Sequence, residues 1–169
     1  VTGEWSREFD INPFSYALNT SRAVRPYDDN GNLEYVQMNY APFNIFNELE
    51  KPFIRGLTLL GGDPFEPENQ RALVPFLHRV RERYPDKDIW AFSGFVLDKE
   101  LTVDGAHPHC EVTDEMLSLV DILVDGRYVD AQRNLSLRFR GSENQRIIDM
   151  NRTRAAGHIV LWEGMNGWK

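Results

Sequence analysis

Cysteine is almost absent from this sequence of 169 residues, in which Cys110 is the only one. A single cysteine excludes an intramolecular disulfide framework, and it excludes an iron–sulfur cluster ligated by several cysteines of this chain. Long apolar runs and a signal-peptide pattern are also absent. The net charge of −7 argues against general nucleic-acid binding, which usually needs a basic surface. We therefore expect a cytoplasmic chain that binds no nucleic acid, and no membrane association of residues 54–169.

The residues that are present differ between two parts of the chain. Residues 1–53 are dense in aromatic and turn-forming residues, and only residues 33–38 alternate in the manner of a short strand. No helical stripe with a clear start and end occurs before Ile45. We interpret residues 1–53 as an irregular segment without a core of its own, and residues 54–169 as an α/β domain.

The α/β interpretation depends on the order of the elements. Short apolar runs predict strands at 57–60, 88–94 and 122–126, with helices at 73–84 and 113–120 between them, the second capped by Thr113. Alternation predicts further strands at 135–140 and 158–162. Strands that alternate with helices indicate a parallel sheet, in which ligands bind at the carboxyl ends of the strands.

The Gly61-Gly62-Asp63-Pro64 loop follows the first of these strands. Two glycines allow the backbone to approach a ligand closely, and the freed amides and carbonyls beside an acid suit the zwitterionic end of an amino acid. The alternative is a tight turn in which Asp63 caps the next helix. The motif is short, and its chemistry alone leaves both interpretations open.

Four blocks of the sequence carry a resemblance to a known family. Residues 56–64, 90–95, 120–128 and 138–149 resemble, in the same order, the anaerobic ribonucleoside-triphosphate reductase-activating proteins of the radical S-adenosyl-L-methionine (SAM) family. The resemblance covers roughly residues 54–163. It implies a partial (β/α) barrel, a 4Fe-4S cluster, and reductive cleavage of SAM to a radical that generates the glycyl radical on the partner, anaerobic ribonucleoside-triphosphate reductase.

The resemblance also implies site residues. Gly61, Gly62, Asp63 and Pro64 match the loop that holds the methionyl group of SAM, and Ser93 and Gly94 follow the next strand at the same edge. The family holds its cluster on a Cys-x3-Cys-x2-Cys loop after the first strand, and residues 1–53 contain no cysteine. The first strand and the cluster loop are therefore missing, and we expect neither a stable cluster nor SAM cleavage from this chain.

Residues 1–50 resemble a different family. Residues 12–27 and 40–50 are similar to a piece of TonB-dependent outer-membrane receptors of the glycan-uptake type. This resemblance leads to the hypothesis of a chimera joined near residues 50–54. Three functions stay open: an inactive relative of the activating enzymes, a non-catalytic module that binds SAM or the partner, and a chimeric fragment that carries part of a receptor.

Two weaker patterns have a plain alternative. His107, His109 and Cys110 bring together three potential soft-metal ligands, but no second cluster supplies a fourth ligand, and the sequence favours a surface loop. Arg138 and Arg140 open a basic stretch that fits a docking surface for the partner or an anion, or a solvated face.

Overall fold

The computed structural model describes residues 45–164, and these form a four-stranded sheet with helices. The strands are β1 (Gly56–Leu59), β2 (Asp88–Phe92), β3 (Ile122–Asp125) and β4 (Arg146–Asp149), and they lie in that order in the sheet. The first three strands are parallel, whereas β4 pairs with β3 in the antiparallel direction. The predicted α/β class is confirmed, and the finer expectation of a partial barrel stays a prediction.

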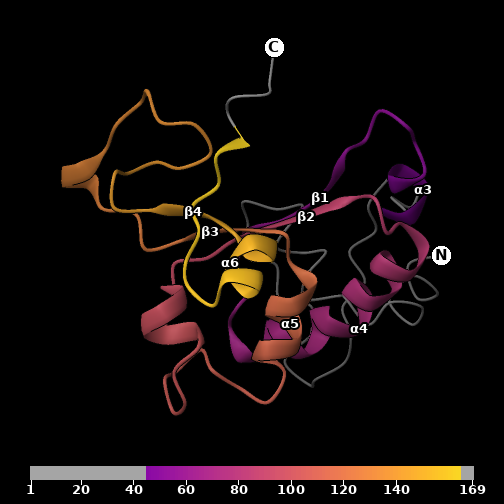
Figure 1. The fold of residues 1–169 in the computed structure, drawn as a ribbon, viewed down its shortest axis with the longest axis horizontal. Coiled ribbons are helices and arrows are strands. Elements are labelled where there is room, and N and C mark those ends of the chain that lie inside the picture. The colour runs from indigo at the N-terminus through magenta and orange to yellow at the C-terminus, as the bar shows by residue number, and fades with distance from the viewer. Residues whose placement is uncertain (1–44, 165–169) are drawn as a thin grey trace, which may run out of the picture.

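The helices gather on one side of this sheet (Figure 1). They are α4 (Pro67–Arg83), α5 (Thr113–Leu119) and α6 (Met150–Ala156), and a turn of π-helix at Leu97–Leu101 follows β2. Leu59, Ala91 and Leu123 are aligned across three strands and are buried. They form the core together with the apolar stripe of α4. Successive side chains along a strand point to opposite faces of the sheet, so three aligned residues share one face.

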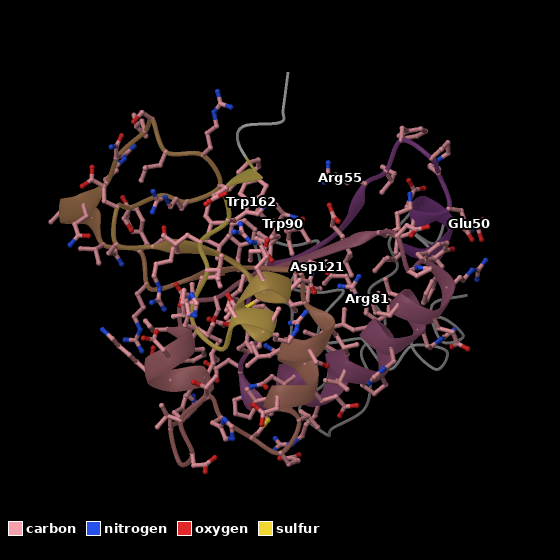
Figure 2. The ribbon with its side chains drawn as sticks, in the orientation of Figure 1. Glu50, Arg55, Arg81, Trp90, Asp121 and Trp162 are labelled. Atoms are coloured by element: carbon pink, nitrogen blue, oxygen red, sulfur yellow. The ribbon has the colours of Figure 1, made fainter. Side chains whose placement is uncertain are left out.

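Within residues 45–164, aromatic side chains gather on the opposite face of the sheet. The ring of Trp90, on β2, contacts those of Trp162 and Phe139 at centroid distances of 4.9 Å and 5.3 Å, and these two rings also contact each other at 6.0 Å. Figure 2 shows Trp90 and Trp162 together on the side of the sheet away from α5 and α6. Phe139 has a φ of 60°, which is uncommon for a residue with a side chain.

Helix α3 (Ile45–Leu49) packs against α4 although it precedes the predicted boundary at residue 53. The ring of Phe46 meets that of Phe76 edge-on at 5.7 Å, and the Tyr84 hydroxyl donates to the Phe46 carbonyl over 2.8 Å. The strand predicted at 33–38 and most of the receptor-like segment lie outside the described residues. The two-part division and the receptor resemblance both stay predictions.

Three local predictions are wrong. Residues 135–140 form turns rather than a strand, because the Asn134 side chain accepts a hydrogen bond from the Ser136 amide over 2.9 Å and so closes a local turn. The fourth strand is β4, and residues 158–162 contribute only a bridge between Leu161 and Ile148. Thr113 does not cap α5 from outside, since it is the first residue of that helix and its hydroxyl accepts from the Cys110 amide.

Among residues 45–164, no helix has both the length and the apolar character needed to cross a membrane.

Candidate functional site at the strand ends

The structure brings Asp63 together with Ser93 and Gly94. The Gly61–Pro64 loop follows β1, and Ser93 and Gly94 follow β2, so that parallel pairing places both loops at one edge of the sheet. The Ser93 hydroxyl lies 2.9 Å and 3.0 Å from the two carboxylate oxygens of Asp63, and the Gly94 amide donates to Asp63 Oδ2 over 2.6 Å. The predicted meeting of the two loops is therefore observed as direct contact.

The carboxylate of Asp63 is committed to its own neighbours. It also accepts from the Phe65 amide over 2.9 Å, so three donors surround it. Burial raises the pKa of Asp63, and the hydrogen bonds from the Phe65 and Gly94 amides and from Ser93 offset only part of that rise. Helix α4 begins at Pro67 with Glu66 at its cap position, so Asp63 does not cap it.

The rest of the loop is held by its backbone. Asn69, in the first turn of α4, donates to the carbonyls of Gly62 and Asp63 over 3.1 Å and 2.8 Å. Gly61 has a φ of 90°, a conformation that favours glycine. Pro64 is buried beneath the loop. No described residue accepts a hydrogen bond from the amides of Gly61 and Gly62, and these exposed donors are what the loop offers to a ligand.

A hollow of about 210 Å³ lies beside this loop, at the carboxyl ends of β2 and β3. Its lining includes Ser93, Gly94, Val124, Gly126, Tyr128 and Gln145. Because Ser93 and Gly94 both line the hollow and contact Asp63, these two residues lie between the loop and the hollow. Tyr128 and Gln145 were not predicted as site residues, since they come from segments that meet β2 only in the folded chain.

A partly buried ion pair lies at the end of β3. Asp125 is 1% exposed, and it accepts from Arg146 over 2.9 Å and 2.5 Å and from the Leu97 amide over 2.8 Å. Arg146 also pairs with Asp98 over 2.7 Å, and this hydrogen bond lowers the pKa of Asp98. The pair locks β3, β4 and the π-helical turn together behind the hollow. Sequence patterns alone did not indicate it.

A second hollow, of about 750 Å³, lies away from the predicted loop. It is lined by Arg138, Arg140, Arg146, Leu161 and Trp162, among others. Arg140 is engaged by the backbone carbonyl of Gln145, whereas Arg138 is exposed and has no partner among the described residues. A docking or anion-binding role for these arginines stays a prediction.

The cysteine and the histidines do not assemble a metal centre in the described residues. His107 faces Glu66 over 3.0 Å, whereas His109 contacts the Leu101 carbonyl over 2.8 Å. Cys110 lies in the loop before α5, beside Thr113. A 4Fe-4S cluster bound in the family manner needs three thiolates, and the chain has one cysteine, so its residues do not fit that group.

Comparison with known proteins identifies relatives with one shared description. The chain is 42% identical over 103 residues to the anaerobic ribonucleoside-triphosphate reductase-activating protein of Haemophilus influenzae, covering 60% of this chain and 61% of that protein. It is 41% identical over 91 residues to the protein of the same name from Pasteurella multocida, covering 54% and 53% of the two chains. The corresponding protein of phage T4 is 37% identical over 105 residues, which are 60% of this chain and 57% of that one.

The chain therefore spans between 53% and 61% of the length of these relatives. No solved structure matches it. The model of the 4Fe-4S single cluster domain family matches residues 29–148, a range that crosses the predicted boundary at residue 53 and includes the strand-end loops. On this match, the chain belongs to the 4Fe-4S single cluster domain family.

Proposed function

We propose that this chain retains the SAM-holding part of an activating protein for anaerobic ribonucleoside-triphosphate reductase. The observation that carries the proposal is the contact of Asp63 with Ser93 and Gly94 at the carboxyl ends of two parallel strands. That contact occurs in a chain whose curated relatives are activating proteins of this reductase. In this proposal the sheet is part of a (β/α) barrel, and the reductase is the partner.

The loop would hold the methionyl end of SAM chiefly through its backbone. The exposed amides of Gly61 and Gly62 suit the carboxylate of the ligand, and the conformation of Gly61 keeps the approach free of a side chain. Asp63 acts indirectly here, because its oxygens hold Ser93, Gly94 and Phe65 in place. SAM would supply a sulfonium and an adenosyl group, and the chain's residues would bind and orient them.

Reductive cleavage of SAM is not part of the proposal for this chain alone. With Cys110 as the only cysteine, its own residues do not supply the thiolates that a family cluster needs. The chain is thus proposed as a binding module that does not carry out the reaction of its relatives by itself.

Calorimetric titration of the full chain with SAM and with methionine tests the proposal. We expect both ligands to bind, and we expect Gly61→Val to abolish binding, because a β-branched residue does not tolerate a φ of 90°. Leu135→Ser, at a side chain that is 84% exposed, is the matched control and should bind as the original chain does. Absence of binding of both ligands to the original chain would refute the proposal.

Anaerobic iron–sulfur reconstitution tests the proposal that this chain does not cleave SAM by itself. We expect no cluster absorption in the visible range and no 5′-deoxyadenosine after addition of SAM and reductant. A stable cluster that cleaves SAM would show that the chain is active despite its single cysteine.

A non-catalytic role toward the partner is the second candidate. The hollow beside Arg138 favours it, because this arginine is exposed and has no partner among the described residues.

A further inference from the structure

The ring of Tyr128 forms one side of the hollow at the strand ends. It lies against the backbone of Gly141, where a Cβ atom would come within 3.1 Å and 3.2 Å of two ring carbons. Such distances are shorter than normal van der Waals contacts, so the position is filled by glycine and the ring rests directly on the main chain. The ring therefore has a fixed support on one side and the hollow on the other.

Gln145 fixes this support relative to β3. Its side-chain oxygen accepts from the amides of Gly141 and Ser142 over 2.8 Å and 3.1 Å, and its amide group donates to the Gly126 carbonyl over 3.0 Å. The Gln145 side chain thus connects the loop under Tyr128 with Gly126, the residue that follows β3. The support of the ring is therefore hydrogen-bonded to Gln145 and, through it, to Gly126, and both of these residues line the hollow.

The hydroxyl of Tyr128 points away to a second anchor. It donates to Asp130 over 3.0 Å, and burial, followed by the hydrogen bond to Asp130, raises the pKa of Tyr128. The phenol therefore stays neutral around pH 7, and its ring presents an uncharged face. Tyr128 is 51% exposed and lines the hollow, so a ligand in the hollow can contact it.

The size of the hollow restricts what it takes. Sites for whole small molecules measure roughly 300–1,000 Å³, and this hollow measures about 210 Å³. It suits one planar ring system rather than all of SAM. It is also adjacent to the Asp63 loop, since Ser93 and Gly94 line the hollow and contact Asp63, so a ligand whose methionyl end lies on that loop would reach the hollow with its other end.

We propose that Tyr128 is the aromatic wall of an adenine subsite, on which the base of SAM stacks. This inference rests on the proposed SAM-holding function, and it adds the residue that recognises the base and the residues, Gly141 and Gln145, that position it. Stacking on an aromatic ring is the means by which proteins commonly hold a base without reading its edges.

Saturation-transfer NMR with adenosine and with methionine, each added separately to the full chain, tests the inference. We expect Tyr128→Leu to weaken adenosine binding about tenfold, since stacking on one aromatic side chain contributes of that order. Tyr128→Phe should bind adenosine within about twofold of the original chain, because it keeps the ring. Gly141→Ala should resemble Tyr128→Leu, because the added methyl group displaces the ring. Methionine binding should be the same in all four proteins.

The possible outcomes distinguish a failure of the adenine subsite from a failure of the proposed SAM-holding function. Equal adenosine signals in the original chain and in Tyr128→Leu, with methionine still bound, would refute the subsite and leave the methionyl site standing. Loss of both ligands in Tyr128→Leu would also refute it, because the substitution would then act on the whole fold. If neither ligand gives a signal with the original chain, the inference and the proposed function both fail.

Discussion

At the scale of single residues, Asp63 is the most constrained group of the candidate site. A carboxylate after two glycines could bind a ligand, cap a helix or connect two loops. The structure shows the third of these, since all three donors around it come from its own chain. For the proposed ligand, the donors that remain are the backbone amides of Gly61 and Gly62 before it. A ligand-binding role for the loop therefore does not require a free acid.

Replacing Asp63 by asparagine tests this connecting role. An amide presents a donor where the carboxylate accepts, so at least one of the amides of Phe65 and Gly94 loses its partner. We expect the free energy of unfolding to fall by about 1–3 kcal/mol, measured by urea denaturation. Ser93→Ala removes one donor and leaves the acceptors, and should cost less. An Asp63→Asn variant as stable as the original chain would contradict the role.

The difference in the free energy of unfolding between the original chain and Asp63→Asn should depend on pH. The pKa of Asp63 is raised above its ordinary value of 3.8, so the folded state binds the proton more tightly than the unfolded state. The original chain therefore gains stability from Asp63 as the pH falls through the folded pKa toward 3.8. The free energy of unfolding of Asp63→Asn should therefore fall further below that of the original chain as the pH is lowered from the folded pKa of Asp63 toward 3.8. Above the folded pKa, the difference between the two proteins should stay constant.

The sequence predicted part of this site for a physical reason. Gly61, Asp63, Ser93 and Gly94 follow neighbouring parallel strands, and parallel pairing brings their ends to one edge. The roles of Tyr128 and Gln145 were not predictable, because they depend on contacts with Gly141 and Gly126 that no periodicity encodes. The direction of the Asp63 carboxylate likewise depends on distances that exist only in the folded chain.

At the scale of elements, the strands and helices that have a regular apolar pattern were predicted correctly, whereas β4 was not predicted. The runs at 57–60, 88–94 and 122–126 correspond to β1, β2 and β3. The alternation at 135–140 was misleading because a side-chain turn at Asn134 outcompetes strand pairing there. Residues 146–149 have the charges Arg146 and Asp149 at their ends and only two apolar residues, too short a pattern to identify β4.

Gly56 sets how closely β1 and β2 approach. A Cβ atom at this position would lie 2.0 Å from the Asp88 carbonyl oxygen, which is backbone and cannot rotate away. We expect Gly56→Ala to lower the free energy of unfolding by about 2–3 kcal/mol, as overpacking does. Gly94→Ala, whose Cβ would have ordinary contacts at 3.5 Å and 3.6 Å, is the control and should unfold nearly as the original. If both variants had the same free energy of unfolding, β1 and β2 would accommodate the added methyl group at residue 56 without loss of stability, and the prediction would be wrong.

At the scale of the whole molecule, one partly buried ion pair connects the helical layer to the sheet. Asp121 accepts from Arg81 of α4 over 2.5 Å, from the Ile89 amide of β2 over 2.8 Å and from Asn151 of α6 over 2.9 Å. Arg81 also donates to the Leu119 carbonyl over 2.6 Å. Figure 2 shows Arg81 and Asp121 side by side between the sheet and the helices.

Removal of one partner should therefore weaken the whole domain. We expect Asp121→Ala to reduce the free energy of unfolding by about 2–3 kcal/mol, because it leaves the Ile89 amide without its acceptor and the Arg81 guanidinium without its anionic partner. The matched control is Glu111→Ala. Glu111 pairs with Arg71 at the surface, and although this pair lowers the pKa of Glu111 to about 2, its removal should leave the unfolding midpoint nearly unchanged. Similar losses in both variants would contradict the special position of Asp121.

The hydrogen bonds from Ser93 and Gly94 to Asp63 also bear on the order in which a complex would assemble. They join the ends of two strands within one polypeptide, so the conformational entropy of ordering the loop is lost during folding and not during ligand binding. A ligand that arrives at Gly61 and Gly62 then meets a loop that already has its shape. Under the proposed function, the binding free energy for the methionyl group is then not reduced by the entropic cost of ordering this loop.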